Sequence, residues 1–370
     1  MTGEASGDLH GAHLAKAIMA LDPTAELVGI GGPGMRAAGV SLVPDVPQLD
    51  VMGLIGLSSI RAWIQRVLAI RRVLKAEAWD LVVLIDNPGL NFHFARVAKA
   101  AGRRVLYYIA PQVWAWRPGR MKWIQRRVDH VVVILPFEPE LYRRAGVRCT
   151  FVGHPLLDSV APQYDRAKLR REFGFDESAR VVGLLPGSRV GEVEMLLPVL
   201  LKAAAQLVEA EPGTQFILAR AASIDDNLIQ SLLRSNPVPV RVVYDRASEV
   251  MALSDVLLIA SGTATLQAAV VGTPMVLLYK TSPVTYRLAR WLVTVKWIGL
   301  VNLVAGRLIV PELIQDEATD ERLCREALRL LRDPSAYNEM KEGLRQVRQL
   351  LGEPGASSRA AQVALSECRL

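Results

Sequence analysis

The sequence predicts an α/β protein made of two doubly wound, Rossmann-like domains that face each other across a cleft. Short, uncharged apolar runs alternate with longer segments of helical spacing along most of the 370 residues. Such runs are typical of parallel strands buried on both faces, and the alternation predicts βαβ units. The length supports two domains, because single cores stop growing at about 250–300 residues.

The predicted domains follow the strands in order. We expect an N-terminal domain at 1–157, a C-terminal domain at 158–340 and a helical segment at 341–370 that closes the fold. The linker is placed near 153–162, because the chain turns polar after it. The expected strands are 81–85, 105–109, 131–135 and 151–153 in the first domain, and 181–185, 215–219, 240–244, 256–259 and 274–278 in the second.

The composition favours anionic partners. The net charge is +7, and the mean hydropathy of +0.22 is high for a soluble protein. Aromatic residues make up 6% and form no basic-aromatic repeat, which argues against a nucleic-acid partner.

The three cysteines are scattered along the chain, which is typical of a protein in a reducing compartment that has neither disulfides nor structural zinc. His10 and His13 lack a third ligand at zinc spacing, and the N-terminus lacks a signal-peptide pattern. We therefore expect a cytoplasmic protein without metal or cofactor.

A candidate diphosphate site follows the strand at 181–185. Pro186-Gly187-Ser188-Arg189 breaks the apolar run, and a helical pattern begins with Glu192 in its first turn. A turn from strand into helix presents backbone N–H groups and a positive dipole end to an anion. Arg189 adds a fork of donors that matches two phosphate oxygens. The alternative is an ordinary turn with a solvated arginine.

Two further loops stand at strand ends, where open α/β sheets bind ligands. Ser261-Gly262-Thr263 follows the strand at 256–259 and enters a helix, so it is expected at the same cleft as Arg189. In the first domain, Asp86 ends the strand at 81–85. Its carboxylate is either a general base or the cap of the next helix.

The glycine loop at 3–8 enters a helix with no strand ahead of it. We expect either that residues encoded before Met1 form that strand, or that the domain opens with an unusual edge. The run from Gly29 to Gly34 formally matches a dinucleotide fingerprint. Because Pro33 lies inside it and no acid-tipped strand follows, it is interpreted as a turn.

Two basic, apolar surfaces are predicted. Residues 51–76 carry five basic and no acidic residues, and the helical pattern from Ile60 follows the apolar run at 54–57. The stretch 256–311 is also free of acids and holds Trp291 and Trp297. Both are typical of membrane-surface elements. The alternative is a core helix with a solvated basic face.

Seven motifs together resemble lipid-A-disaccharide synthase, a glycosyltransferase family of the two-domain GT-B architecture. They run in order along the chain from residue 3 to about residue 317. They are GEASGD at 3–8, PQVWAWR at 111–117, LPFE at 135–138, GHP at 153–155, LLPGSRxxEV at 184–193, SGTATL with Gln267 at 261–267, and Asn-Leu-x-Ala-Gly-Arg at 302–307.

The resemblance implies an inverting, metal-independent transfer. The donor would be UDP-2,3-diacylglucosamine and the acceptor the 6-hydroxyl of 2,3-diacylglucosamine 1-phosphate, giving the β-1,6 lipid A disaccharide 1-phosphate and UDP. The protein would be peripheral on the anionic inner face of the inner membrane, with a homodimer among the expected forms. The expected catalytic residues are Asp86 and Arg189. The expected substrate-binding residues are Glu4, Ser6, Gly7, Asp8, Gly187, Ser188, Glu192, Ser261, Gly262, Thr263, Gln267 and Asn302.

Several alternatives stay open at this stage. Asp8, Glu4 and Glu138 are rival bases to Asp86. Asp86-Asn87-Pro88-Gly89 lacks the second acid of the family's usual Asp-x-Pro-Asp run. Gln267 replaces a glutamate that receives ribose hydroxyls in related enzymes, so weaker donor binding is expected. The competing functions are another UDP-sugar transferase acting on a membrane lipid, and a non-enzymatic lipid or nucleic-acid binder.

Overall fold

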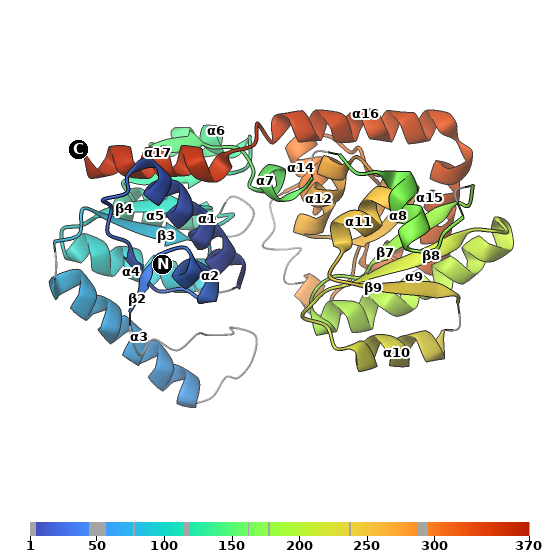
Figure 1. Ribbon diagram of the computed structural model, residues 1–370, viewed down its shortest axis with the longest axis horizontal. Coiled ribbons are helices and arrows are strands. Elements are labelled where there is room, and N and C mark those ends of the chain that lie inside the picture. Colours follow the sequence, from blue (N-terminus) through green and yellow to red (C-terminus); the bar gives the residue numbers. More distant parts are fainter. Residues whose placement is uncertain are drawn as a thin grey trace. The chain divides into compact units, whose positions relative to one another are not determined.

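The structure is a computed structural model that describes residues 5–43, 57–76, 78–113, 118–161, 163–176, 178–236, 238–283, 285–287 and 295–369. The chain divides into two compact units (Figure 1). The first contains Met1–Pro155 together with Gly352–Leu370, and the second contains Leu156–Leu351. The predicted boundary at 157/158 lies two residues beyond this division.

The C-terminal segment differs from the prediction of a separate closing piece at 341–370. The predicted start falls inside α16 (Pro334–Leu350), which packs on α12 and α14 of the second unit. The last helix, α17 (Ala356–Cys368), belongs to the first unit and packs along α1 (Ala5–Leu21). The buried face of α17 is lined by alanines, which allow α1 to pack closely against it. The assignment of α17 to the first unit therefore depends on tertiary packing, which the helical pattern of the sequence does not show.

The first unit contains a parallel four-stranded sheet in the order β3 (Leu81–Ile85), β4 (Arg104–Tyr108), β5 (His130–Val133) and β6 (Cys149–Phe151). A separate parallel pair joins β1 (Val28–Gly29) to β2 (Ser41–Leu42). The four strands predicted for this domain are confirmed, each to within a few residues.

Helices cover both faces of this sheet (Figure 1). Ile85 packs in one core with residues of α1 and α17, whereas Val82 and Leu84 pack in the other with residues of α3 and α4. This alternation follows from the two-residue period of a strand. The remaining helices of the unit are α2 (Pro33–Ala37), α3 (Leu57–Ala76), α4 (Pro88–Ala100), the 3-10 turn η1 (Pro118–Arg120), α5 (Met121–Arg127) and α6 (Glu138–Arg144).

The buried carboxylate of Glu367 fastens α17 to the sheet. One carboxylate oxygen of Glu367 lies 3.0 Å from Nδ1 of His130 and 2.8 Å from Arg148, and the other lies 3.2 Å from Arg104. A buried carboxylate is costly unless it is paired. The end of the chain is therefore bound specifically to β4 and β5.

The second unit contains a parallel six-stranded sheet in the order β12-β11-β10-β7-β8-β9. From the opposite edge, the sequence order is the doubly wound 3-2-1-4-5-6, which reverses direction between β7 and β10. Its strands are β7 (Val181–Leu185), β8 (Gln215–Arg220), β9 (Val240–Tyr244), β10 (Val256–Ala260), β11 (Met275–Tyr279) and β12 (Glu312–Ile314). The five strands predicted here are confirmed.

The helices of the second unit pack around that sheet. They are α7 (Leu156–Ser159), α8 (Arg166–Glu172), α9 (Val190–Ala210), α10 (Asp226–Ser235), α11 (Ala247–Leu253), α12 (Thr263–Val271), α14 (Leu300–Ala305), η2 (Gln315–Glu317), α15 (Asp320–Arg332) and α16. Within the described residues, none of the helices of either unit has the length and apolar character to span a membrane.

Candidate active site

The two loops predicted to bind an anion leave neighbouring strands of the second unit. β7 pairs with β10, and their last paired residues are Leu185 and Ile259. The loops at 186–189 and 261–262 therefore start side by side at the carboxyl edge of the sheet. This edge is the reversal point of the strand order, where doubly wound sheets bind ligands.

The turn after β7 requires glycine because of its backbone conformation. Gly187 has a φ of +110°, outside the range that residues with a Cβ favour. The turn is braced by Ser223, whose hydroxyl donates to the carbonyl of Ser188 over 2.7 Å. α9 begins directly after it, at Val190.

Arg189 is the exposed cation of this turn. Its side chain is 66% exposed, and Nη1 donates to Oε1 of Glu192 over 3.0 Å. An exposed ion pair of this kind contributes only about 0–1 kcal/mol. The guanidinium can therefore exchange Glu192 for a phosphate at little cost.

The second loop places small residues at the start of α12. Gly262 precedes the helix, and Thr263 is its exposed first residue. Ser261 donates its backbone N–H to Leu278 of β11 over 3.0 Å. The amide nitrogen of Gln267 donates to the hydroxyl of Ser248 over 2.7 Å, so its amide oxygen is the group suited to accept from a sugar hydroxyl.

Asn302 occupies a different setting from the one expected. Its side chain is fully buried, and its amide nitrogen donates to the carbonyl of Val310 and to Glu312. Its amide oxygen accepts from the backbone N–H groups of Ile309 and Val310. These four bonds fasten α14 to residues 309–312, at the start of β12. The structure thus gives Asn302 a structural role and does not bring its amide to a ligand surface.

In the first unit, Asp86 lies at the carboxyl end of β3 in an unusual turn. Asp86 and Asn87 have φ values of +49° and +38°, which are uncommon for residues other than glycine. Such conformations persist where the surroundings fix them. Here Asn91, buried in α4, donates its amide N–H groups to the carbonyls of Ile85 (2.9 Å) and Asp86 (2.7 Å).

Tyr107 holds the same turn from β4. Its hydroxyl donates to the carbonyl of Asp86 over 2.8 Å. Burial, and then the negative charge of Asp86, raise the pKa of Tyr107 far above its usual value. The phenol therefore stays protonated and remains a donor. Two buried side chains thus fix the backbone that carries the Asp86 carboxylate.

Two of the three rival carboxylates, those of Asp8 and Glu138, accept backbone N–H groups within the protein. Asp8 accepts three backbone N–H groups at the start of α2, from Gly32 (2.7 Å), Gly34 (2.8 Å) and Met35 (3.0 Å). This also explains why the formal dinucleotide fingerprint is a turn, since an internal carboxylate occupies the helix start. Glu138 is buried and accepts the backbone N–H of Leu135 over 3.0 Å.

The remaining residues of the predicted acceptor loop are only partly described. Gly7 is buried in α1, and of Ser6 the structure describes the backbone, also in α1. Glu4 lies outside the described residues, as do the apolar residues 54–56 and Trp291 of the predicted membrane surfaces.

A model of the family described as lipid-A-disaccharide synthetase matches residues 1–366. A lipid-A-disaccharide synthase from Geobacter metallireducens is 47% identical over 99% of this chain and 95% of its own length. One from Syntrophus aciditrophicus is 44% identical over 99% of this chain and 96% of its own. The chain belongs to the lipid-A-disaccharide synthetase family. It is therefore a glycosyltransferase enzyme of lipid A biosynthesis.

Solved structures support the fold of this family member. Staphylococcus aureus MnaA in complex with UDP aligns with a TM-score of 0.66 at 13% identity, over 97% of this chain and 93% of that one. The spinosyn rhamnosyltransferase SpnG aligns with a TM-score of 0.56 at 14% identity, over 96% of each chain. The predicted α/β class and GT-B architecture are confirmed.

Sequence reasoning missed three buried polar residues of this synthetase. Asn91 and Tyr107 hold the Asp86 turn, and an asparagine inside an apolar helix was the available signal for the first. His154 follows β6 in the GHP motif and is buried; burial, and then His10, lower its pKa to about 4. Within the described residues, no three His, Cys, Asp or Glu side chains are grouped closely enough to hold a metal.

Proposed function

We propose that this glycosyltransferase joins two diacylglucosamine units. It transfers 2,3-diacylglucosamine from UDP-2,3-diacylglucosamine to the 6-hydroxyl of 2,3-diacylglucosamine 1-phosphate. The products are the β-1,6 disaccharide 1-phosphate and UDP. Family membership supports this reaction. The observation that carries it is the pair of loops, with exposed Arg189, at the reversal point of the second sheet.

The loop after β7 would bind the diphosphate of the donor. Gly187 and Ser188 place the chain at the start of the 21-residue helix α9, whose first N–H groups and dipole favour an anion. Arg189 would neutralise the charge that develops on UDP as it leaves. A charge-assisted hydrogen bond is worth about 1.5–3 kcal/mol, and its effect on rate is largest where charge develops in the transition state.

The loop at 261–263 and Gln267 would bind the nucleoside part of the donor. Ser261, Gly262 and Thr263 start a helix beside the diphosphate loop. Gln267 would accept one ribose hydroxyl. A glutamate there could accept two charge-assisted bonds, so this chain should bind the donor less tightly than a relative with glutamate.

Asp86 would act as the general base of an inverting transfer. The carboxylate takes the proton of the acceptor 6-hydroxyl. The electron pair left on that oxygen then forms the bond to the anomeric carbon. The bond from that carbon to UDP breaks, and its electrons leave on the diphosphate. The rigid turn supports this role, because a base must be held within hydrogen-bond reach of its proton.

The lipid substrates would be reached at an anionic membrane surface. On α3, Ile64 and Leu68 are 46% and 47% exposed, and Arg71 and Arg72 are exposed on the same helix. Basic residues near an anionic surface contribute about 1 kcal/mol each at low salt. Peripheral binding to the inner face of the inner membrane would follow. Homodimerisation stays a prediction.

The decisive experiment offers the purified protein UDP-2,3-diacylglucosamine with a panel of acceptors and identifies products by mass spectrometry. We expect the disaccharide 1-phosphate with 2,3-diacylglucosamine 1-phosphate alone. Transfer only to a different membrane lipid would favour the second candidate, another UDP-sugar transferase. UDP should also raise the melting temperature, and its failure to do so would contradict the proposed donor site.

A further inference from the structure

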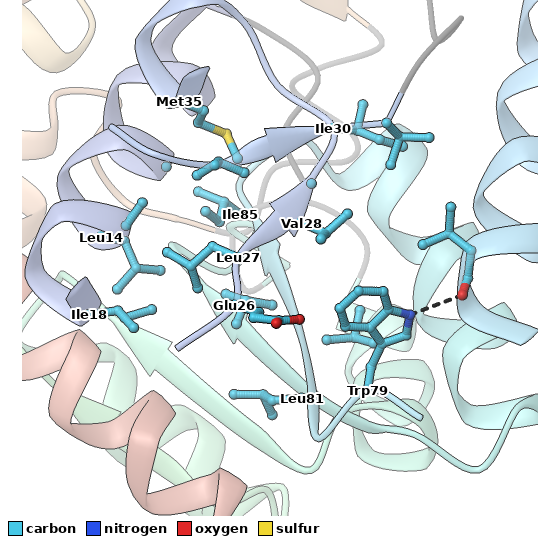
Figure 2. Close-up of a pocket in the computed structure, with 18 of the residues that line it drawn as sticks. Leu14, Ile18, Glu26, Leu27, Val28, Ile30, Met35, Trp79, Leu81 and Ile85 are labelled. Carbon is cyan, nitrogen blue, oxygen red and sulfur yellow. Dashed lines mark hydrogen bonds between the residues drawn. The ribbon is translucent and has the colours of Figure 1, made fainter. Parts of the chain in front are cut away.

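The neighbouring strands β3 and β4 both end in buried side chains. Ile85, the last residue of β3, lines an apolar pocket of the first unit together with Leu14 and Met35 (Figure 2). It pairs with Tyr108, the fully buried last residue of β4. Polar side chains that can meet a substrate at this part of the sheet edge therefore belong to the residues that follow the two strands.

The backbone after each of these strands has an unusual conformation. Asp86 has a φ of +49° and donates its backbone N–H to the carbonyl of Tyr108 over 3.1 Å, so the strand pairing extends to it. Ile109 has a φ of +53°, an outlier for a β-branched residue, and donates its N–H to Val132 of β5 over 3.0 Å. Such conformations persist only where the surroundings fix them, and they cluster at functional sites.

The loop after β4 presents Gln112 to solvent. Among residues 109–113 only Gln112 is exposed, and Ala110, Pro111 and Val113 are buried on either side of it. The N–H of Val113 donates to the carbonyl of Pro111 over 2.6 Å, which makes Gln112 the central residue of a γ-turn. Within the part of the chain that the structure describes, the Gln112 amide has no hydrogen-bond partner. An anchored loop thus holds out one amide.

Gln112 belongs to the same local surface as Asp86. Asp86 and Ile109 directly follow a pair of opposite residues on adjacent strands, and such strands lie about 4.8 Å apart. Gln112 is three residues beyond Ile109, and three residues span at most about 11 Å. The candidate base and the exposed amide therefore follow neighbouring strands at one edge of the sheet.

The proposed acceptor poses a problem of selectivity that an amide at this place can solve. 2,3-Diacylglucosamine 1-phosphate has free hydroxyls at positions 4 and 6, and only the 6-hydroxyl is to lose its proton to Asp86. A carboxylate can take that proton, whereas a glutamine amide only donates and accepts hydrogen bonds. A glutamine beside the base can therefore hold one hydroxyl without activating it. Because it is neutral, it repels neither the Asp86 carboxylate nor the acceptor phosphate.

We propose that Gln112 binds the 4-hydroxyl of the acceptor and so directs the 6-hydroxyl to Asp86. The inference rests on the proposed transfer to 2,3-diacylglucosamine 1-phosphate with Asp86 as the base. The Gln112 amide offers both a donor and an acceptor, and a sugar hydroxyl can pair with either. Gln112 takes no part in the proton transfer itself, and its role is to bind and orient the acceptor.

The test is a cycle of two proteins and two acceptors. Wild-type protein and Gln112→Ala each receive short-chain 2,3-diacylglucosamine 1-phosphate or its 4-deoxy analogue, with UDP-2,3-diacylglucosamine as donor. With the parent acceptor, we expect Gln112→Ala to lower kcat/KM for the acceptor by about two- to tenfold, the effect of one neutral hydrogen bond. The KM for the donor and the urea midpoint should not change, because the side chain is exposed. With the 4-deoxy acceptor, the two proteins should have equal kcat/KM.

Gln125→Ala is the matched control. Gln125 is an exposed glutamine of α5, the helix that leads to the amino end of β5, so it lies away from the carboxyl edge. This variant should behave as wild type with both acceptors. Equal kcat/KM for wild type and Gln112→Ala with the parent acceptor would overturn the inference, as would an equal loss with both acceptors. Failure of the proposed function is distinguishable, because wild-type protein would then form no disaccharide from the parent acceptor.

Discussion

The turn after β3 and the turn after β7 lead from a strand into a helix at corresponding places, yet they are built in opposite ways. The first carries Asp86 and Asn87 at positive φ without glycine, and buried Asn91 and Tyr107 hold it. The second relies on Gly187 for its positive φ. It ends in an arginine that is 66% exposed and bonded to one surface carboxylate.

This difference fits the chemistry proposed for each turn. A base that removes a proton must be held within a narrow range of distance and angle. A cation that follows a leaving diphosphate gains from reach, since the backbone N–H groups at the start of α9 supply the fixed part of the site. If the proposed roles hold, the buried hydrogen bonds fix the turn that carries the base, and the exposed arginine lies on the turn that binds the leaving diphosphate.

The largest expected effect is that of Asp86→Asn. Asparagine tolerates positive φ and keeps the shape of the turn, so the protein should fold and bind UDP normally. Positioned general bases contribute about 10²–10⁴-fold, and turnover should fall at least about a hundredfold. Single-turnover kinetics with saturating donor measure this.

Asp8→Asn is the matched control for that prediction. An amide NH₂ would face the three N–H groups that the Asp8 carboxylate now accepts. The control should therefore lower the free energy of unfolding while the folded fraction keeps its turnover. If Asp86→Asn retains more than about a tenth of the activity while folded Asp8→Asn has lost it, the base is Asp8.

Arg189→Ala should have the next largest effect. Losing a charge-assisted bond of about 1.5–3 kcal/mol predicts a loss in turnover of about tenfold or more. Arg189→Lys should recover only part, because an ammonium lacks the planar fork. The free energy of unfolding should hardly change, since the pair with Glu192 is exposed. Steady-state kinetics on both variants suffice, and wild-type values for Arg189→Ala would remove it from the site.

Tyr107→Phe should act on the first turn alone. It removes one hydrogen bond worth about 0.5–1.5 kcal/mol and leaves the Asp86 carbonyl with Asn91. We expect kcat to fall by about two- to tenfold with the KM for the donor unchanged. A purely structural role would lower stability and leave kcat per folded molecule unchanged. Tyr142→Phe, at another buried tyrosine of the same unit, is the control and should leave kcat as it is.

The fold was predictable because its signals are local. The runs that form β3, β7 and β10 are apolar on both faces, and the residues that break them mark the loops. Gly187 and Arg189 could be named for the same reason, since strand, turn and helix stand next to one another in the chain.

The features that the sequence could not show depend on partners distant in sequence. Asp8 accepts three N–H groups at the start of α2, which lies 24–27 residues later. Asn302 looked like a ligand until Glu312 and the backbone at 309–310 closed around it. The division of the C-terminal segment depends on the contacts of α17 with α1, which begins at the opposite end of the chain. The periodicity of apolar residues indicates local structure and does not show which distant residues are in contact.

The smallest expected effect, that of Glu192→Gln, decides how Glu192 serves the second turn. As the surface partner of Arg189, it competes with the diphosphate for the guanidinium, and a pair of this kind is worth at most about 1 kcal/mol. Removing its charge should therefore tighten UDP binding by up to about fivefold, while the loss of an acid from the first turn of α9 lowers stability by about 0.3–1 kcal/mol. Isothermal titration with UDP and urea unfolding measure the two effects. Weaker UDP binding would mean instead that Glu192 contacts the donor directly, and the second turn would then depend on a fixed carboxylate as the first one does.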